Sequence, residues 1–135
     1  MNILIQWKPE YELGIKEVDQ QHKKLVDMIN QVYDSYVLGA ADLTHTQVLS
    51  DMKDYAFVHF KAEEHYFAKY QYKHTSLHLA EHNSFLMKIE EYQNTRSLTQ
   101  ERKQEMIDYL RHWLVNHILQ MDRKYAESFA RGEIL

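Results

Sequence analysis

The chain has 135 residues, about the size of one domain, and its 16 basic and 20 acidic residues give a net charge of −4. This negative charge, with no long basic run, argues against a nucleic-acid partner or an anionic membrane surface. Because the sequence contains no cysteine, it excludes disulfides, zinc fingers and cysteine-bound iron–sulfur clusters, and any metal must be bound through nitrogen and oxygen.

Nine histidines stand beside only three glycines and one proline. So few turn-forming residues favour an all-α fold. No apolar stretch approaches the ~20 residues that span a bilayer, and the N-terminus lacks the basic start and apolar centre of a secretory signal. We therefore expect a single domain over residues 1–135, located in the cytoplasm and without a membrane partner.

An irregular arm over residues 1–15 is expected to precede a helical bundle over residues 16–131. The first helix begins between Lys16 and Val18 and ends at Gly39, because glycine readily takes the left-handed conformation of a helix C-cap. Apolar positions recur along it at steps of three and four, the spacing of a helix face that packs in a bundle. This face carries Val18, His22, Leu25, Ile29, Val32 and Tyr36.

The second and third helices show the same periodicity, again with polar residues on the buried face. The second runs from about Leu43 to Tyr70, and the third begins near Thr75 or Ser76, both suitable N-caps, and ends where the sequence NTRS breaks the pattern. The buried face of the second carries Leu49, Met52, Ala56, His59, Glu63, Phe67 and Tyr70, and that of the third carries His78, His82, Phe85, Ile89 and Tyr92.

The fourth helix is expected to begin between Ser97 and Thr99 and to continue through Tyr125 and Phe129 to Arg131. Its buried face carries Met106, Leu110, Trp113 and His117. Four helices of about 20 residues with short connections pack most simply as an up-down-up-down bundle, in which neighbours are antiparallel. In that arrangement one layer at one end of the core receives His22, His59, Glu63, His78, His82 and His117.

Such a layer favours a metal site over a set of hydrogen-bonded core residues, because an unpartnered polar group costs roughly 2 to 7 kcal/mol to bury. The pairs His59/Glu63 and His78/His82 are spaced i, i+4, which places two donors on one helix face. With Asp122 the donors number seven, too many for one zinc ion and suited to two metals that share carboxylate bridges. Imidazole and carboxylate ligands leave iron, zinc, manganese and copper open. Ferritin-like sites are excluded, because no histidine here has a glutamate three residues before it.

Four segments together resemble the hemerythrin family, and specifically its single-domain bacterial members. They are VDQQHKKL around His22, HFKAEEH around His59 and Glu63, HLAEHNSF around His78 and His82, and WLVNHILQMD, which ends at Asp122. The family pattern is a lone His followed by H-x-x-x-E, H-x-x-x-H and H-x-x-x-x-D, and the resemblance covers nearly the whole chain.

The resemblance implies a centre of two iron ions with an oxo or hydroxo bridge, at which dioxygen binds reversibly and no enzymatic turnover occurs. It assigns one iron to His78, His82 and His117 and the other, which binds oxygen, to His22 and His59, with Glu63 and Asp122 bridging. Four residues that flank the ligands are expected to line an oxygen pocket, and these are Phe60, Trp113, Leu114 and Ile118; the resemblance places Leu114 and Ile118 at its border.

His117 and Asp122 are five residues apart, which turns them about 140° from each other on an ideal helix. We therefore expect a helix distortion there, such as a π-bulge. Glu64 is expected to face away from the site. The remaining histidines are expected at the surface, and these are His45, His65, His74 and His112.

Other functions remain open alongside oxygen carriage, storage or buffering. The same centre suits an oxygen or redox sensor that works through a docking partner, or a di-iron peroxidase or nitric-oxide-handling enzyme. Metal storage and a purely structural bundle are the simplest alternatives. Because no continuous apolar stripe is evident on the outer faces, a monomer is preferred over a dimer, and no protein partner can be named.

Overall fold

The computed structural model describes residues 3–37, 39, 42–95 and 99–130. The regular elements among these residues are all helical, and none of these residues forms a strand. In chain order it forms η1 (Pro9–Tyr11), α1 (Lys16–Val37), α2 (Asp42–Tyr70), α3 (Thr75–Asn94), α4 (Gln100–Asn116), the π-helical turn η2 (His117–Asp122) and α5 (Arg123–Ala130).

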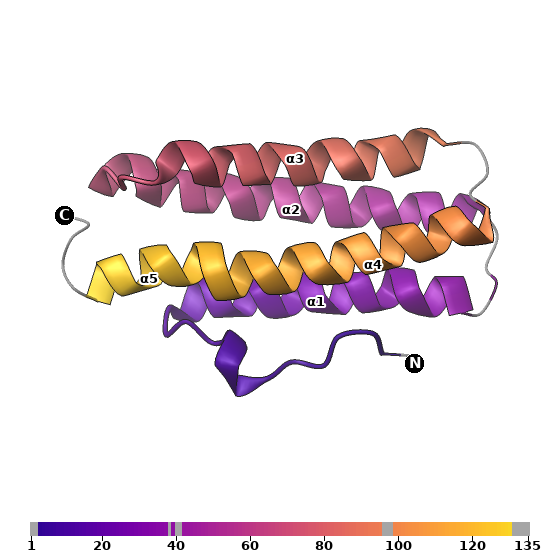
Figure 1. The fold of residues 1–135 in the computed structure, drawn as a ribbon, viewed down its shortest axis with the longest axis horizontal. Coiled ribbons are helices and arrows are strands. Elements are labelled where there is room, and N and C mark those ends of the chain that lie inside the picture. Colours follow the sequence, from indigo (N-terminus) through magenta and orange to yellow (C-terminus); the bar gives the residue numbers. More distant parts are fainter. Residues whose placement is uncertain (1–2, 38, 40–41, 96–98, 131–135) are drawn as a thin grey trace.

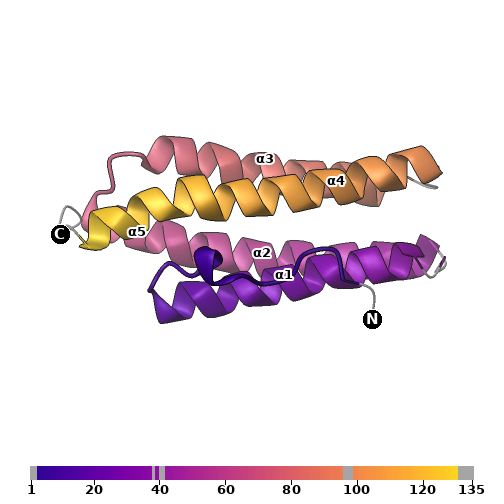
Figure 2. The same ribbon diagram turned by 60° about the horizontal axis from the view of Figure 1, so that its bottom comes forward.

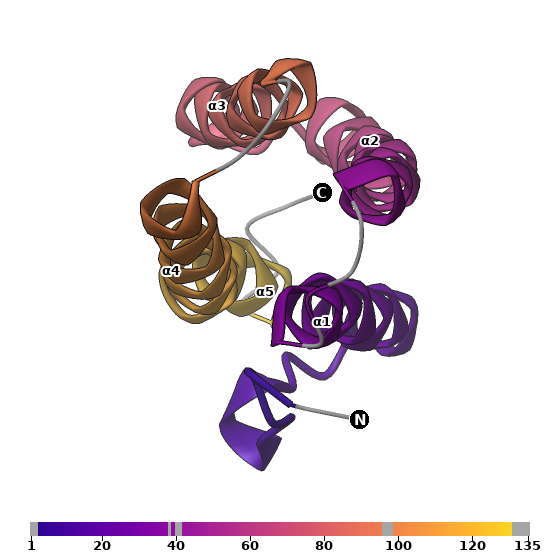
Figure 3. The same ribbon diagram turned by 90° about the vertical axis from the view of Figure 1, so that its right-hand side faces the viewer.

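The helices form an up-down-up-down bundle, as the sequence predicts (Figure 1). Helix α1 packs against α2 and α4, and α2 packs against α3. Viewed along the long axis, the helices surround one core, and η2 and α5 extend α4 as the fourth helix (Figure 3). The starts of α1 and α3 and the ends of α2 and α5 therefore lie at the same end of the bundle.

The predicted apolar faces point into this core. Buried side chains on them include Leu25, Met52, Ile89 and Leu110, while Tyr36, Tyr70 and Trp113 are only partly buried. The side chains of His45 and Phe129, and residue Arg131, lie outside the described residues.

Local hydrogen bonds are found at the starts of α4 and α3. The Thr99 side chain caps α4 by accepting a hydrogen bond from the amide of Arg102 at 3.1 Å, as expected from its position. The expected caps of α3 are wrong: His74 is the N-cap residue, and Thr75 already belongs to the helix. Its hydroxyl instead donates to the carbonyl of Tyr72 at 2.6 Å, which holds the preceding turn.

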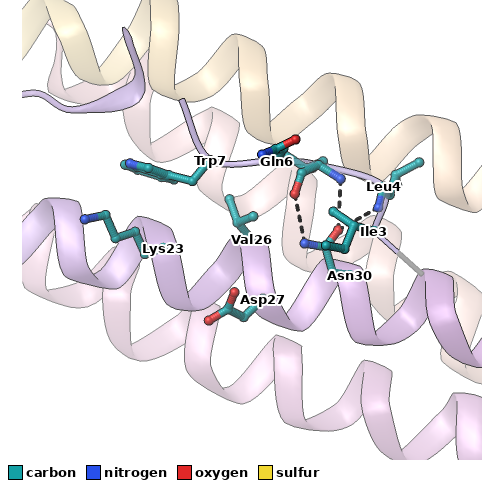
Figure 4. Close-up of a pocket in the computed structure, with 9 residues that line it drawn as sticks. Ile3, Leu4, Gln6, Trp7, Lys23, Val26, Asp27 and Asn30 are labelled. Atoms are coloured by element: carbon teal, nitrogen blue, oxygen red, sulfur yellow. Dashed lines mark hydrogen bonds between the residues drawn. The ribbon is translucent and has the colours of Figure 1, made fainter. Parts of the chain in front are cut away.

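The N-terminal arm runs along the outside of the bundle beside α1 (Figure 2). Buried Asn30 fixes it, because its side-chain oxygen accepts from the amides of Leu4 and Ile5, both at 2.9 Å, and its amide donates to the carbonyl of Ile5 at 2.9 Å (Figure 4). Nearer α1, Asp19 accepts from the amides of Leu13, at 2.8 Å, and Gly14, at 3.2 Å. The arm is thus held against α1 at two places.

Candidate metal centre

The structure brings all seven predicted donor side chains into one layer near the end of the bundle. They come from four stretches of helix: α1 supplies one, and α2, α3 and η2 supply two each. Every one of them is at most 3% exposed. They are His22, His59, Glu63, His78, His82, His117 and Asp122.

Their nitrogen and oxygen atoms fall into two overlapping groups. In each group one atom from every residue lies within 4.8 Å of the others. One group contains three histidines, His78, His82 and His117, together with Glu63. The other contains two histidines, His22 and His59, together with Glu63 and Asp122. Since Glu63 belongs to both, two metal ions bound in these groups would share a ligand.

Asp122 also reaches both groups. Its Oδ1 lies 2.7 Å from Nε2 of His78 and 3.0 Å from Nε2 of His117, while its Oδ2 lies 2.8 Å from Nε2 of His22. Glu63 differs, because its Oε1 alone lies 3.2 Å from Nε2 of both His59 and His82. Each carboxylate therefore stands between histidines of the two groups.

The predicted distortion between His117 and Asp122 is confirmed, since these residues bound the π-helical turn η2. A π-turn closes i to i+5 hydrogen bonds, so a residue five positions on returns to nearly the same face. Both side chains thereby point into the core, where a continuous α-helix would turn Asp122 away by about 140°.

The donor layer carries charge even without a metal. Burial alone lowers the pKa of His117, but the facing carboxylate of Asp122 outweighs it and raises that pKa to about 10. Burial raises the pKa of Glu63, but the charge of His59 together with hydrogen bonds from His117, His59 and His82 brings it well below its ordinary value. Burial and the charge of Glu63 raise the pKa of Asp122. The charge of His117 and hydrogen bonds from His117 and His22 lower it by more, so that the pKa lies below its ordinary value. Both carboxylates are thus ionised at neutral pH, and protons occupy positions that metal cations can take.

Many nitrogen and oxygen atoms of the donor layer lack hydrogen-bond partners among the described residues, as expected of metal ligands. Although the donors lie close together, several buried nitrogens and oxygens have no hydrogen bond of acceptable geometry from the described residues. They are Nδ1 and Nε2 of His22 and of His117, Nε2 of His59 and of His82, Nδ1 of His78, both oxygens of Glu63 and Oδ2 of Asp122. Buried polar atoms are nearly always paired, so a set this large in one place calls for bound cations.

Aromatic rings pack against the histidines. Phe60 stacks on His82 with ring centroids 3.9 Å apart and planes 6° apart, and Trp113 stacks on His117 at 4.5 Å and 11°. At the end of the bundle Phe67 and Tyr125 contact the ring of His78, at 4.6 and 5.7 Å. These contacts limit the rotation of the histidine rings.

The predicted pocket residues Leu114 and Ile118 are 2% and 1% exposed and belong to the same core cluster as Phe60. They lie three residues before and one residue after His117. Their position beside the donor layer is thus consistent with a pocket wall.

The other histidines stay out of the donor layer. His65 and His112 are exposed, as predicted, but His74 is half-buried, with its ring 5.6 Å from that of Tyr72. It therefore remains partly exposed, at the turn before α3, and lies outside the donor layer.

Two polar residues beside the donor layer were not assigned a role from the sequence. Glu64 is not among the clustered donors, but it does not face away: its Oε2 accepts from Nδ1 of His82 at 3.0 Å. Gln21 was missed, and its Oε1 accepts from Nδ1 of His59. The signal was their place in the sequence, directly beside His22 and Glu63.

Comparison with known proteins identifies the family of this chain. The family model of the hemerythrin HHE cation-binding domain matches residues 13–128. A bacteriohemerythrin of Clostridium acetobutylicum is 34% identical over 128 residues, with 90% of this chain and 98% of that protein covered. A bacteriohemerythrin of Pseudomonas aeruginosa is 29% identical over 122 residues, with 90% of this chain and 79% of that protein covered.

A solved structure of wild-type hemerythrin shares the fold, with a TM-score of 0.80 and 28% identity, and the match covers 92% of this chain and 96% of that one. None of the helices in the described part of the chain is long and apolar enough to cross a membrane.

Proposed function

Because this chain belongs to the hemerythrin family, we propose that it binds dioxygen reversibly at a centre of two iron ions, as an oxygen carrier, store or buffer. The observation that carries the proposal is the pair of overlapping donor groups, which share Glu63 and differ in their number of histidines. A site for a single ion would need only one of them.

In this proposal His78, His82 and His117 hold one iron, and His22 and His59 hold the other. Glu63 and Asp122 bridge them, in keeping with their short distances to histidines of both groups. With two histidines in place of three, the second position has fewer protein ligands and is the one assigned to oxygen binding. When bound, the two irons supply the electrons that dioxygen takes up on binding and returns on release.

The protein contributes a dry and rigid surrounding. Phe60, Leu114 and Ile118 are almost fully buried, Phe60 and Trp113 stack on histidine rings, and Leu114 and Ile118 lie within three residues of His117 in the sequence. Apolar walls exclude water and offer no proton that would drive reduced oxygen off the site. These four residues are proposed to form the oxygen pocket and to favour release of oxygen over turnover.

The test is to load the purified protein with ferrous iron under nitrogen, count the iron and record visible spectra through cycles of air and deoxygenation. The expected result is two irons per chain and an absorption band that appears in air and disappears on deoxygenation. A single irreversible oxidation would contradict oxygen carriage and would favour redox sensing or catalysis. Two irons without any reaction with oxygen would favour metal storage.

A further inference from the structure

Gln21 and Glu64 lie directly beside the donor layer without belonging to it. Each is the sequence neighbour of a donor, since Gln21 precedes His22 and Glu64 follows Glu63. One residue turns about 100° around a helix axis, so both side chains stand at the edge of a helix–helix contact. From there each reaches a histidine on the next helix: Gln21 in α1 reaches α2, and Glu64 in α2 reaches α3.

These contacts set the same ring orientation in two histidines. In His82, Nδ1 donates to Glu64 while Nε2 faces Glu63 Oε1 at 3.2 Å. In His59, Nδ1 donates to Gln21 while Nε2 faces the same Glu63 oxygen, also at 3.2 Å. A hydrogen on Nδ1 leaves the lone pair on Nε2, which is the tautomer that binds a metal in the layer.

The two acceptors differ in charge. Glu64 offers a carboxylate whose side chain is only 16% exposed, and its other oxygen lies 3.1 Å from Nζ of Lys61. Gln21 offers a neutral amide. A carboxylate behind a histidine strengthens the hydrogen bond and makes the ring a better metal ligand, whereas an amide does so less.

We infer that Glu64 and Gln21 are positioning residues that make the two metal positions unequal, so that the protein fills them in order. The ion held by His78, His82 and His117 binds first, because it has more histidines and the carboxylate-backed ring. The ion held by His22 and His59 binds second and more weakly. This inference rests on the proposed two-metal site.

The experiment titrates cobalt(II) under nitrogen into the metal-free protein and follows its visible absorption, which reports binding without oxygen chemistry. For the wild-type protein we expect two ions per chain in two separate steps. In Glu64→Gln an acceptor oxygen remains and only the charge is lost, so the first step should weaken by about 10- to 100-fold while the second changes little. In Gln21→Glu the second step should strengthen.

A matched control is Asp54→Asn, which removes an exposed negative charge from the same helix about 15 Å from Glu64. Both cobalt affinities should stay unchanged in this variant. The gain in Gln21→Glu separates a role in metal binding from a structural one, because loss of packing cannot raise an affinity.

The outcomes distinguish the inference from the proposed function. If the wild-type protein binds two ions and Glu64→Gln binds both with wild-type affinity, the ordering role of Glu64 is wrong and the two-metal site stands. If the wild-type protein binds fewer than two ions, the two-metal site itself is wrong, and the inference is overturned with it.

Discussion

Each of the five histidines in the metal centre turns the same ring nitrogen, Nε2, toward a carboxylate. His22, His78 and His117 face Asp122, and His59 and His82 face Glu63, at distances of 2.7 to 3.2 Å. Among these histidines, the pKa of His117 is raised by the facing carboxylates of Asp122 and Glu63, against the effect of burial. At the scale of single residues the site is therefore a set of charges whose balance depends on pH.

Metal binding should release protons at neutral pH. The pKa of His117 is raised to about 10, so this ring is protonated in the metal-free protein and has to lose its proton to bind a metal. Metal affinity should therefore increase with pH between about 6.5 and 8.5. Calorimetric titration with zinc in two buffers of different ionisation enthalpy measures the protons released.

The raised pKa of His117 also affects the stability of the metal-free protein, which should decrease with rising pH where metal affinity increases. A raised pKa stabilises the folded state fully below the unfolded value of about 6.5, and this stabilisation is lost as pH rises through about 10.

For the prediction of proton release on metal binding, a zinc affinity independent of pH, with no proton release, would show that His117 is neutral before the metal binds.

Leu114→Ala should speed the irreversible oxidation of the iron-loaded protein in air severalfold, because the lost side chain opens the proposed pocket to water. Leu110→Ala is the matched control: it removes the same atoms from a fully buried position one turn earlier in α4. Both variants should lose about 2 to 5 kcal/mol of stability. Stopped-flow absorbance gives the oxidation rate, and equal rates in the two variants would remove Leu114 from the pocket.

At the scale of the elements, the turn between α2 and α3 joins two parts of the site. Gln71 adopts a left-handed conformation with φ of 54°, and the amide of Tyr72 donates to the carbonyl of Phe67 at 3.0 Å, which is the hydrogen bond of a Schellman cap. The rings of Phe67 and Tyr72 pack at 5.1 Å, and Phe67 in turn contacts His78. This cap thus fixes the start of α3 relative to the donors of α2.

Gln71→Gly should stabilise the protein by about 1 kcal/mol, because glycine takes a left-handed conformation without the steric cost of a Cβ. Lys69→Gly, at an exposed α-helical position two residues earlier, should instead cost about 1 kcal/mol. Urea unfolding followed by circular dichroism measures both. A loss of stability in Gln71→Gly would mean that the glutamine side chain contributes more than its backbone conformation costs.

At the scale of the whole molecule, one buried side chain of the bundle makes three hydrogen bonds to the arm. Asn30 satisfies two amides and one carbonyl of the arm, some 25 residues away in sequence. In doing so it holds buried Ile5 against the core cluster that also contains Leu114 and Ile118. The arm therefore covers α1 on the side away from α2 and α3 (Figure 3).

Asn30→Ala should release the arm and lower the free energy of unfolding by about 1 to 3 kcal/mol, since three backbone groups lose their partners. Hydrogen exchange at the amides of Leu4 and Ile5 should accelerate, while the metal content stays at the wild-type value. Asn83→Ala, at an exposed position in α3, is the control. Unchanged exchange at Leu4 and Ile5 would show that apolar contacts alone hold the arm.

The sequence by itself determined the all-α bundle and the positions of the five buried histidines and Glu63 along their helices. These features follow from helix geometry, in which 3.6 residues per turn fix which side chains share a face. The distortion between His117 and Asp122 was expected for another reason, because the resemblance to hemerythrins assigns both residues to one site although an ideal helix turns them apart. The hydrophobic pattern therefore located His22 and His59 on buried faces without knowledge of any neighbour. The same pattern could not place His74, which lies outside a helix.

Only the tertiary structure decided which groups meet at the edges of the helix contacts. Glu64 and Gln21 occupy positions that a helical pattern assigns to the flank, where a side chain reaches solvent or the next helix according to the offset between the two helices. The hydrogen bonds between Asn30 and the arm likewise join residues about 25 positions apart in sequence, which no helical period relates. Such contacts are set by how whole helices dock, and this relative placement is not encoded in the period of a single helix.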